Sequence, residues 1–319
     1  MLALRMTPRL PGWGTTDLGA ESAGEDARPG DPRTPPMDTS PERTRFGPYR
    51  LLRTLDACPA ADRLLALHEK RLTSHVVYRF GAMRDAAERR RFVAAVEPLA
   101  RVAHPHLLPI EEYSFASDGR AWVVTPYTGS QVGLVTLARL VQDKGGQMSP
   151  HEATRALTHV LEAVAAAHAA GLVHGPIGAD DVLIDRRGSA AIELYGVSRR
   201  LRALPDAGLE ADEARRDEVR SVVTLGYRLL TGLEPAAPAV SPTKLVKRLD
   251  RRWNEFFAAG LGDRPGTRAG DEPAGGFATA EDALDALLGT ERAPIVVVPA
   301  AAKPAKPATP MRGVPSVQA

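Results

Sequence analysis

The order of strand-like and helix-like patterns limits the fold of this chain more than any other feature. Four short apolar runs come first, YRLLRTL, DRLLALH, HVVYRF and AWVVTPY, and each is typical of a β-strand. From Ser149 the apolar residues recur at helical spacing, with a Ser149–Glu152 capping box and Pro150 at the first helical position. Two strand-like runs, DVLI and AAIEL, and three more helical stretches follow. A β-rich half followed by a helical half predicts an α+β fold with two lobes.

The two ends of the chain differ in composition from its middle. Residues 1–46 carry proline, glycine and mixed charge without apolar periodicity, and residues 291–319 have proline every few positions. Both compositions are typical of segments that do not pack into a core. We therefore expect a disordered segment at 1–46, a folded domain at 47–290 and a flexible tail at 291–319. Within the domain we expect a β-rich lobe at about 47–129 and a helical lobe at about 130–290.

The charge and cysteine content exclude several kinds of partner and site. Lys and Arg number 41 against 39 Asp and Glu, and this balance predicts no nucleic-acid partner. The one cysteine, Cys58, excludes a disulfide framework and a cysteine metal cluster. No apolar run reaches about 18 residues, and charged residues interrupt the N-terminus where a signal peptide would be apolar. We expect a cytoplasmic protein without a membrane partner, whose protein partner the sequence does not identify.

Several separated segments share the spacing of a known family. His174 and Asp181 match the two ends of a catalytic-loop motif, and Leu194-Tyr195-Gly196 begins thirteen residues after Asp181. AHPHLLPI, WVVTPYTG and YRLLTGLEP match three further segments in register. On these segments the chain resembles the eukaryotic-type (bacterial-like) protein serine/threonine kinases over roughly residues 49–288. The resemblance implies a bilobal protein-kinase-like fold.

The positions that this resemblance assigns to phosphate transfer hold residues without the required chemistry. The three glycines of the phosphate-covering loop align with Asp56, Cys58 and Ala61. The phosphate-binding lysine, its glutamate partner, the catalytic base and the magnesium-binding aspartate align, in that order, with Arg79, Ala95, Pro176 and Leu194. The segment that follows Leu194 is also short, so we expect the family's peptide-docking surface to be absent.

The residues that form the family's packed interior are kept. Four stacked side chains that would join the lobes align with Leu99, Ile110, His174 and Tyr195. The nucleotide pocket that the resemblance implies would be lined by Val77, Arg79, Thr125, Tyr127, Asp181 and Leu183. Asp181 is the one candidate metal ligand, and because a single carboxylate rarely holds Mg²⁺ alone, we expect no metal site.

A kept interior without the transfer chemistry predicts a catalytically inactive kinase-like domain, a pseudokinase, that acts as a scaffold or regulatory interaction module. Two alternatives stay open. The first is an active but atypical serine/threonine protein kinase that uses Arg79 and Asp181 with relocated acids. The second is a switch that binds ATP without transferring phosphate. We expect no cofactor, with ATP as the ligand of the second alternative and Mg²⁺ as a ligand of the first.

Overall fold

The computed structural model describes residues 45–56, 58, 60–130, 133–204, 208–262 and 275–289. The chain divides between Arg43 and Thr44 into two units, and all the described residues belong to the second unit. The expected flexible tail lies outside the described residues, and so does the expected disordered segment apart from Arg45 and Phe46. These two residues form the first strand, so the folded domain begins before the expected boundary at residue 47.

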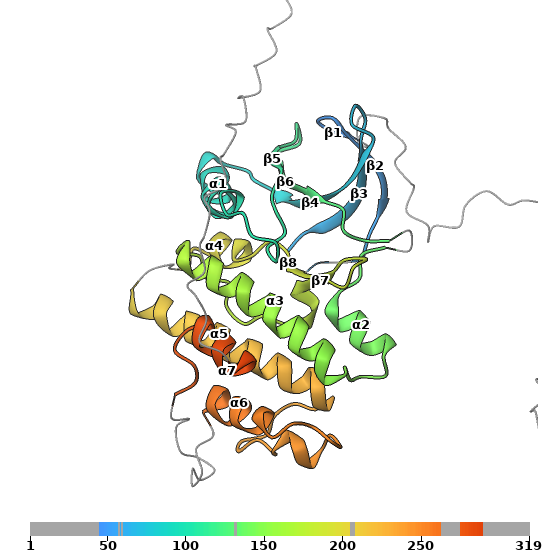
Figure 1. Cartoon of the computed structure of the whole chain (residues 1–319). Coiled ribbons are helices and arrows are strands. Elements are labelled where there is room, and N and C mark those ends of the chain that lie inside the picture. The colour runs from blue at the N-terminus through green and yellow to red at the C-terminus, as the bar shows by residue number, and fades with distance from the viewer. Residues whose placement is uncertain are drawn as a thin grey trace, which may run out of the picture. The chain divides into compact units, whose positions relative to one another are not determined.

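A six-stranded antiparallel sheet forms the N-terminal lobe (Figure 1). Its strands are β1 (Arg45–Phe46), β2 (Tyr49–Thr54), β3 (Asp62–His68), β4 (Thr73–Ala82), β5 (Glu112–Phe115) and β6 (Arg120–Pro126). Their order in the sheet is β1-β2-β3-β4-β6-β5. The four apolar runs read from the sequence correspond to β2, β3, β4 and β6, so these predicted strands are confirmed.

Strand β4 is apolar on both faces because both faces are covered. Tyr78 and Phe80 belong to the main core cluster, in which Phe80 packs against Phe92 of helix α1 (Ala86–Ala100) with ring centroids 5.3 Å apart. Val77 points to the opposite face and belongs to a second, smaller cluster that includes Trp122. The face of the sheet that carries Tyr78 is therefore the face toward α1.

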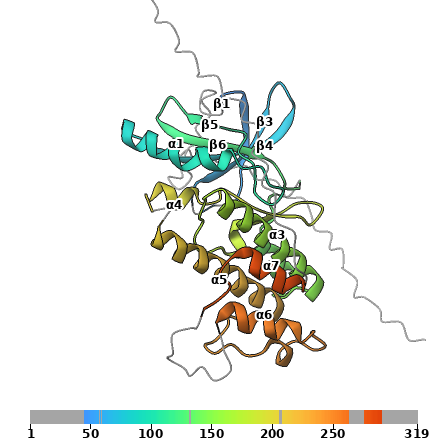
Figure 2. The same cartoon turned by 60° about the vertical axis from the view of Figure 1, so that its left-hand side comes forward.

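The helical lobe follows the sheet. Its helices are α2 (Leu137–Asp143), α3 (Pro150–Ala169), α4 (Val197–Leu201), α5 (Leu209–Thr231), α6 (Arg252–Leu261) and α7 (Ala280–Leu288). Two 3₁₀ turns, η2 (Ala179–Asp181) and η3 (Pro242–Lys244), and a short hairpin of β7 (Val182–Ile184) and β8 (Ala190–Ile192) complete it. Helices α3 and α5 lie side by side at the centre of the lobe, and α4 lies directly below α1 (Figures 1 and 2).

Local sequence signals explain where the central helices begin and how closely they approach. The capping box is confirmed: Ser149 Oγ accepts a hydrogen bond from the Glu152 backbone N–H, and the Glu152 carboxylate accepts one from the Ser149 N–H at 3.1 Å. On α5, a Cβ at Gly226 would lie 2.6 Å from Leu157 of α3. Only glycine therefore permits this spacing of α3 and α5.

A β-rich lobe followed by a helical lobe is the arrangement that the sequence predicts, so the two-lobed α+β fold is confirmed. Among the described residues, no helix combines the length and the apolar character needed to cross a membrane.

Candidate functional site

Three buried polar side chains meet where the sheet faces the helical lobe. Arg63 of β3 and Tyr78 of β4 are paired directly across the two strands, so their side chains lie on the same face of the sheet. Glu193, the residue after β8, reaches them from the helical lobe. Its carboxylate accepts a hydrogen bond of 2.6 Å from the Tyr78 hydroxyl and one of 3.2 Å from Arg63 Nε. The second carboxylate oxygen accepts from Arg63 Nη2, so the ion pair is bidentate.

This interlobe ion pair is closed to solvent. The side chains of Arg63 and Glu193 are 3% and 4% exposed, and Tyr78 is fully buried. Burial raises the pKa of the Tyr78 hydroxyl well above its ordinary value, while the nearby Arg63 charge acts in the opposite direction. Tyr78 therefore keeps its proton, and its hydroxyl donates a hydrogen bond to Glu193. Because water is excluded, removing either charge would leave the other one buried without a partner.

The backbone around Glu193 is fixed on both sides. The Glu193 N–H donates to the Asp181 carbonyl at 3.1 Å. The Ile192 carbonyl accepts from the Leu108 N–H at 2.9 Å, and this bond ties the hairpin to the loop after α1. These backbone hydrogen bonds fix the point from which the Glu193 side chain extends.

The structure corrects the placement of two expected pocket residues. Val77 and Arg79 were expected to face the helical lobe, but they lie on the face of β4 that points away from it. Val77 packs with Trp122, and Arg79 forms an ion pair of 2.8 Å with Asp62 on the neighbouring strand. The physical reason is the two-residue period of a strand, because Tyr78 occupies the inward position between them.

The position that the resemblance assigns to the glutamate partner of the phosphate-binding lysine holds Ala95, whose side chain points into the core. Ala95 is fully buried in the core of α1. Glu97, the nearest acid on the helix, forms an ion pair with Arg101 one turn later, and the Glu97 side chain is 41% exposed. The described part of α1 therefore directs its carboxylates to solvent at this point and not to β4.

The positions of the expected base and metal ligands hold residues with structural roles. Leu194 is buried in the main core with a φ of 45°. Pro176 is exposed and has no titratable group. The Asp181 carboxylate accepts a hydrogen bond of 2.8 Å from the Gly178 N–H, so it closes the turn that precedes β7. Within the described ranges, no group of three or more His, Cys, Asp and Glu is placed to hold a metal ion.

Three other expected pocket residues are buried or half-buried in the interior of the domain. Thr125 is fully buried and pairs with Val76 across β6 and β4. Leu183 is in the main core cluster, and Tyr127 packs against that cluster. All three therefore lie in or against the interior to which Tyr78 also belongs, and the pocket that they were expected to line stays a prediction.

The four residues expected to stack between the lobes lie in or against the main core. Leu99, Ile110 and Tyr195 are all members of it. The ring of His174 is partly buried and packs edge-on against Tyr195, with 5.3 Å between ring centroids. They continue the packed interior from α1 to the loop after β8.

A second buried carboxylate holds the loop that carries His174. Glu218 of α5 is fully buried and accepts hydrogen bonds from the backbone N–H groups of His174 at 2.8 Å and Gly175 at 3.0 Å. It also accepts from the Tyr195 hydroxyl. Gly196, with a φ of 70°, follows at a point where a Cβ would lie 2.6 Å from the Val173 carbonyl oxygen. The catalytic-loop frame is thus built from packing and backbone hydrogen bonds.

Sequence reasoning did not identify Arg63, Tyr78 or Glu193 as site residues. A signal was present, because Arg63 is a charged residue near the start of the apolar run DRLLALH and Glu193 interrupts AAIEL. An arginine and a glutamate each need a partner when they are buried. Each was visible alone, but their contact joins residues 130 positions apart.

Comparisons with known proteins agree with this fold. No known protein-family model matches the chain. The chain is 25% identical over 224 residues to serine/threonine-protein kinase PknE of Mycobacterium tuberculosis, covering 61% of this chain and 37% of PknE. It is 30% identical over 131 residues to PknL of the same organism, covering 36% of this chain and 33% of PknL. The chain thus spans about a third of the length of these curated relatives.

The fold has a solved counterpart. The crystal structure of the Mycobacterium tuberculosis PknI kinase domain matches with a TM-score of 0.57 and 19% identity. The match covers 77% of this chain and 97% of the PknI domain. The chain therefore has the fold of a protein kinase domain and is similar in sequence to mycobacterial serine/threonine protein kinases.

Proposed function

We propose that this kinase-like domain does not transfer phosphate and acts by binding another protein. The observation that carries the proposal is the interlobe ion pair of Arg63 and Glu193, completed by Tyr78. These side chains fill the space between β4 and the start of the Leu194 segment. The resemblance to kinases implies that nucleotide phosphates would lie there.

The charge of this site opposes phosphate binding. Arg63 is the inward-facing cation, and Glu193 already neutralises it. A phosphate entering the site would meet the Glu193 carboxylate at short range in a region of low dielectric, where like charges repel strongly. Binding would require the bidentate pair to break, which leaves one charge buried without a partner.

Magnesium does not fit the residues that remain. The position implied for its aspartate is Leu194, an apolar side chain in the core. The Asp181 carboxylate is used by the Gly178 N–H. Hard cations such as Mg²⁺ need several oxygen ligands in octahedral order. The site therefore offers neither the ligands nor, at Pro176, a group that accepts a proton.

The kept framework supports a binding role. Glu218, Tyr195 and His174 maintain the catalytic-loop frame through buried contacts, although Pro176 in that loop has no acid–base chemistry. A frame of this kind holds a surface in a fixed shape. A fixed surface is what a scaffold or regulatory interaction module needs, because less entropy is lost when it binds.

Phosphate transfer from γ-labelled ATP tests the proposal. The full 319-residue chain is incubated at high concentration with ATP, Mg²⁺ or Mn²⁺, and casein as a generic acceptor. We expect no labelling of the chain or of casein above a heat-denatured control. Labelling that rises with protein concentration and is lost in Asp181→Asn would overturn the proposal in favour of an atypical kinase. Labelling that Asp181→Asn leaves unchanged would indicate a contaminating kinase, and the measurement would be repeated after a further purification step.

A further inference from the structure

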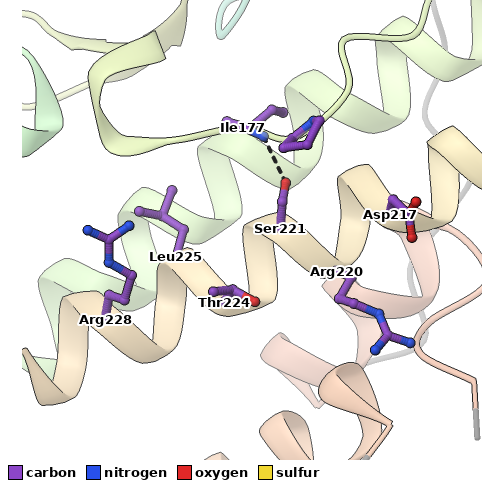
Figure 3. Close-up of a pocket in the computed structure, with 8 residues that line it drawn as sticks. Ile177, Asp217, Arg220, Ser221, Thr224, Leu225 and Arg228 are labelled. Atoms are coloured by element: carbon purple, nitrogen blue, oxygen red, sulfur yellow. Dashed lines mark hydrogen bonds between the residues drawn. The ribbon is translucent and has the colours of Figure 1, made fainter. Parts of the chain in front are cut away.

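An open groove lies along one face of α5, and its lining residues are drawn in Figure 3. Its volume is about 360 Å³. The groove is lined by Pro176, Ile177, Asp217, Arg220, Ser221, Thr224, Leu225 and Arg228. The six residues from α5 are spaced so that they form one stripe of the helix. From Asp217 to Arg228 this stripe extends about 16 Å along the axis.

Hydrogen bonds fix the wall of the groove to its floor. Ser221 Oγ accepts from the Ile177 N–H at 2.8 Å, as Figure 3 shows, and donates to the Glu218 carbonyl at 2.6 Å. Glu218 in turn accepts from the Gly175 N–H. The loop before β7 is therefore attached to α5 at two points. The groove has its shape before any partner arrives.

The lining combines an apolar floor with a positive balance of charge. Ile177 and Leu225 lie at the base, each only 3% exposed, and Pro176 is the exposed apolar residue of the lining. Arg220 and Arg228 flank Leu225 along the helix, and Asp217 is the acidic residue of the lining, so the net charge of the lining is +1. Arg220 is held at the edge by a 3.2 Å hydrogen bond to the Leu261 carbonyl.

Arg228 is the charge best placed to meet a partner. Its side chain is 50% exposed, and its ion pair with Glu234, at 3.0 Å, joins two exposed groups. Exposed pairs of this kind contribute only about 0–1 kcal/mol. A carboxylate from a partner can therefore replace Glu234 at little cost.

We propose that this groove binds an extended segment of a partner protein with an apolar side chain and an acidic side chain two residues apart. The apolar side chain packs against Pro176 above the base formed by Ile177 and Leu225, and the acidic side chain contacts Arg228. In an extended segment, side chains two residues apart point the same way and are separated by about 7 Å. Leu225 and Arg228 are about 4.5 Å apart along the helix axis. The long arginine side chain extends this distance, so the two positions can contact side chains that are about 7 Å apart.

A protein segment fits this surface better than a polyanion does. Nucleic acids bind to surfaces with several cations and no acids, because each phosphate contact needs its own positive charge. Here Asp217 lies within the stripe, and the whole chain has a net charge of only +2. The inference rests on the proposed function, since it names the surface through which a non-catalytic domain would bind.

Selection from a random phage-displayed library of 12-residue peptides against the full-length chain tests the inference. We expect enriched peptides to share an apolar residue two positions from Asp or Glu. Arg228→Glu should weaken their binding about fivefold or more through loss and reversal of the charge pair. Thr224→Arg should also weaken it by filling the groove. Arg216→Glu, on an exposed part of the same helix outside the lining, should leave binding unchanged.

Three results would overturn the inference: no enrichment, enriched peptides without this pattern, or peptides whose binding is equally sensitive to Arg216→Glu. Thermal midpoints within about 1 °C of the wild type would show that the variants are folded. Failure of the selection while phosphate transfer stays absent would refute the groove and leave the proposed function intact. Phosphate transfer by the unmodified chain would refute the proposed function whatever the peptides show.

Discussion

Replacing Glu193 with glutamine should destabilise the domain strongly, because it breaks the interlobe ion pair while keeping the shape of the side chain. Arg63 would keep its charge with a side chain that is 3% exposed. Breaking a buried ion pair in this way costs about 3–5 kcal/mol. The Tyr78 hydroxyl would also exchange a charged acceptor for a neutral one, which weakens its hydrogen bond.

Urea denaturation monitored by tryptophan fluorescence measures this effect. A loss of 3–5 kcal/mol corresponds to a fall of about 10 °C in the thermal midpoint for a domain of this size. Asp62→Asn is the matched control, since it breaks the Asp62–Arg79 pair on the same two strands, where Asp62 is 59% exposed. The control should lose no more than about 1 kcal/mol. Equal, small losses in both variants would refute the reasoning that the interlobe ion pair is buried and mutually dependent.

A triple variant shows whether the loss in Glu193→Gln comes from the unpaired Arg63 charge or from the change of packing. Arg63→Met, Tyr78→Phe and Glu193→Leu together remove both charges and the hydroxyl, so neither charge is left buried without the other. Replacing a buried ion pair by apolar residues of similar size is often neutral or stabilising. We expect the triple variant to regain most of the stability that Glu193→Gln loses.

Three further predictions concern the loop frame and the helical lobe. Gly196→Ala should cost about 2 kcal/mol or more in urea denaturation, because φ is 70° and the new Cβ would lie 2.6 Å from the Val173 carbonyl oxygen. Glu218→Gln should cost about 3 kcal/mol by weakening the buried hydrogen bonds to the loop and to Tyr195. Burial, and next the charge of a neighbouring histidine, lower the pKa of His159 to about 4 from 6.5. Stability should therefore be full above pH 6.5 and fall between pH 6.5 and 4, by about 1 kcal/mol for a partly exposed ring, and His159→Gln should flatten this part of the thermal-midpoint profile.

Local signals in the sequence were sufficient for the main elements. The capping box at Ser149 and Glu152 depends on residues three apart, and it formed as the spacing predicts. The strand runs and the change to helical spacing depend on equally short windows. These patterns were enough to predict a two-lobed α+β fold.

Short stretches of sequence did not reveal which face of β4 points toward the helical lobe. Val76, Val77 and Tyr78 are all fully buried, so the strand shows no alternation between apolar and polar residues that would mark its inward face. The alignment placed Val77 and Arg79 inward, one residue out of register with the structure. The inward face is decided by partners far along the chain, Phe92 for one side and Trp122 for the other.

The interlobe ion pair was hidden for the same reason. The apolar run that ends at Glu193 does not say what this carboxylate meets. Its partners are Arg63, which comes 130 residues earlier, and Tyr78, which comes 115 residues earlier. Only the packing of the two lobes brings these three side chains together.

The thermal midpoint of the full-length chain with millimolar ATP, with and without Mg²⁺, tests the central claim most directly. A nucleotide bound at 100 times its dissociation constant would add about 2.7 kcal/mol and raise the midpoint by several degrees. We predict no rise, because Arg63, Tyr78 and Glu193 fill the site. A rise without Mg²⁺ would contradict the account in favour of an ATP-binding switch, and a rise that requires Mg²⁺ would favour an atypical kinase acting through Asp181.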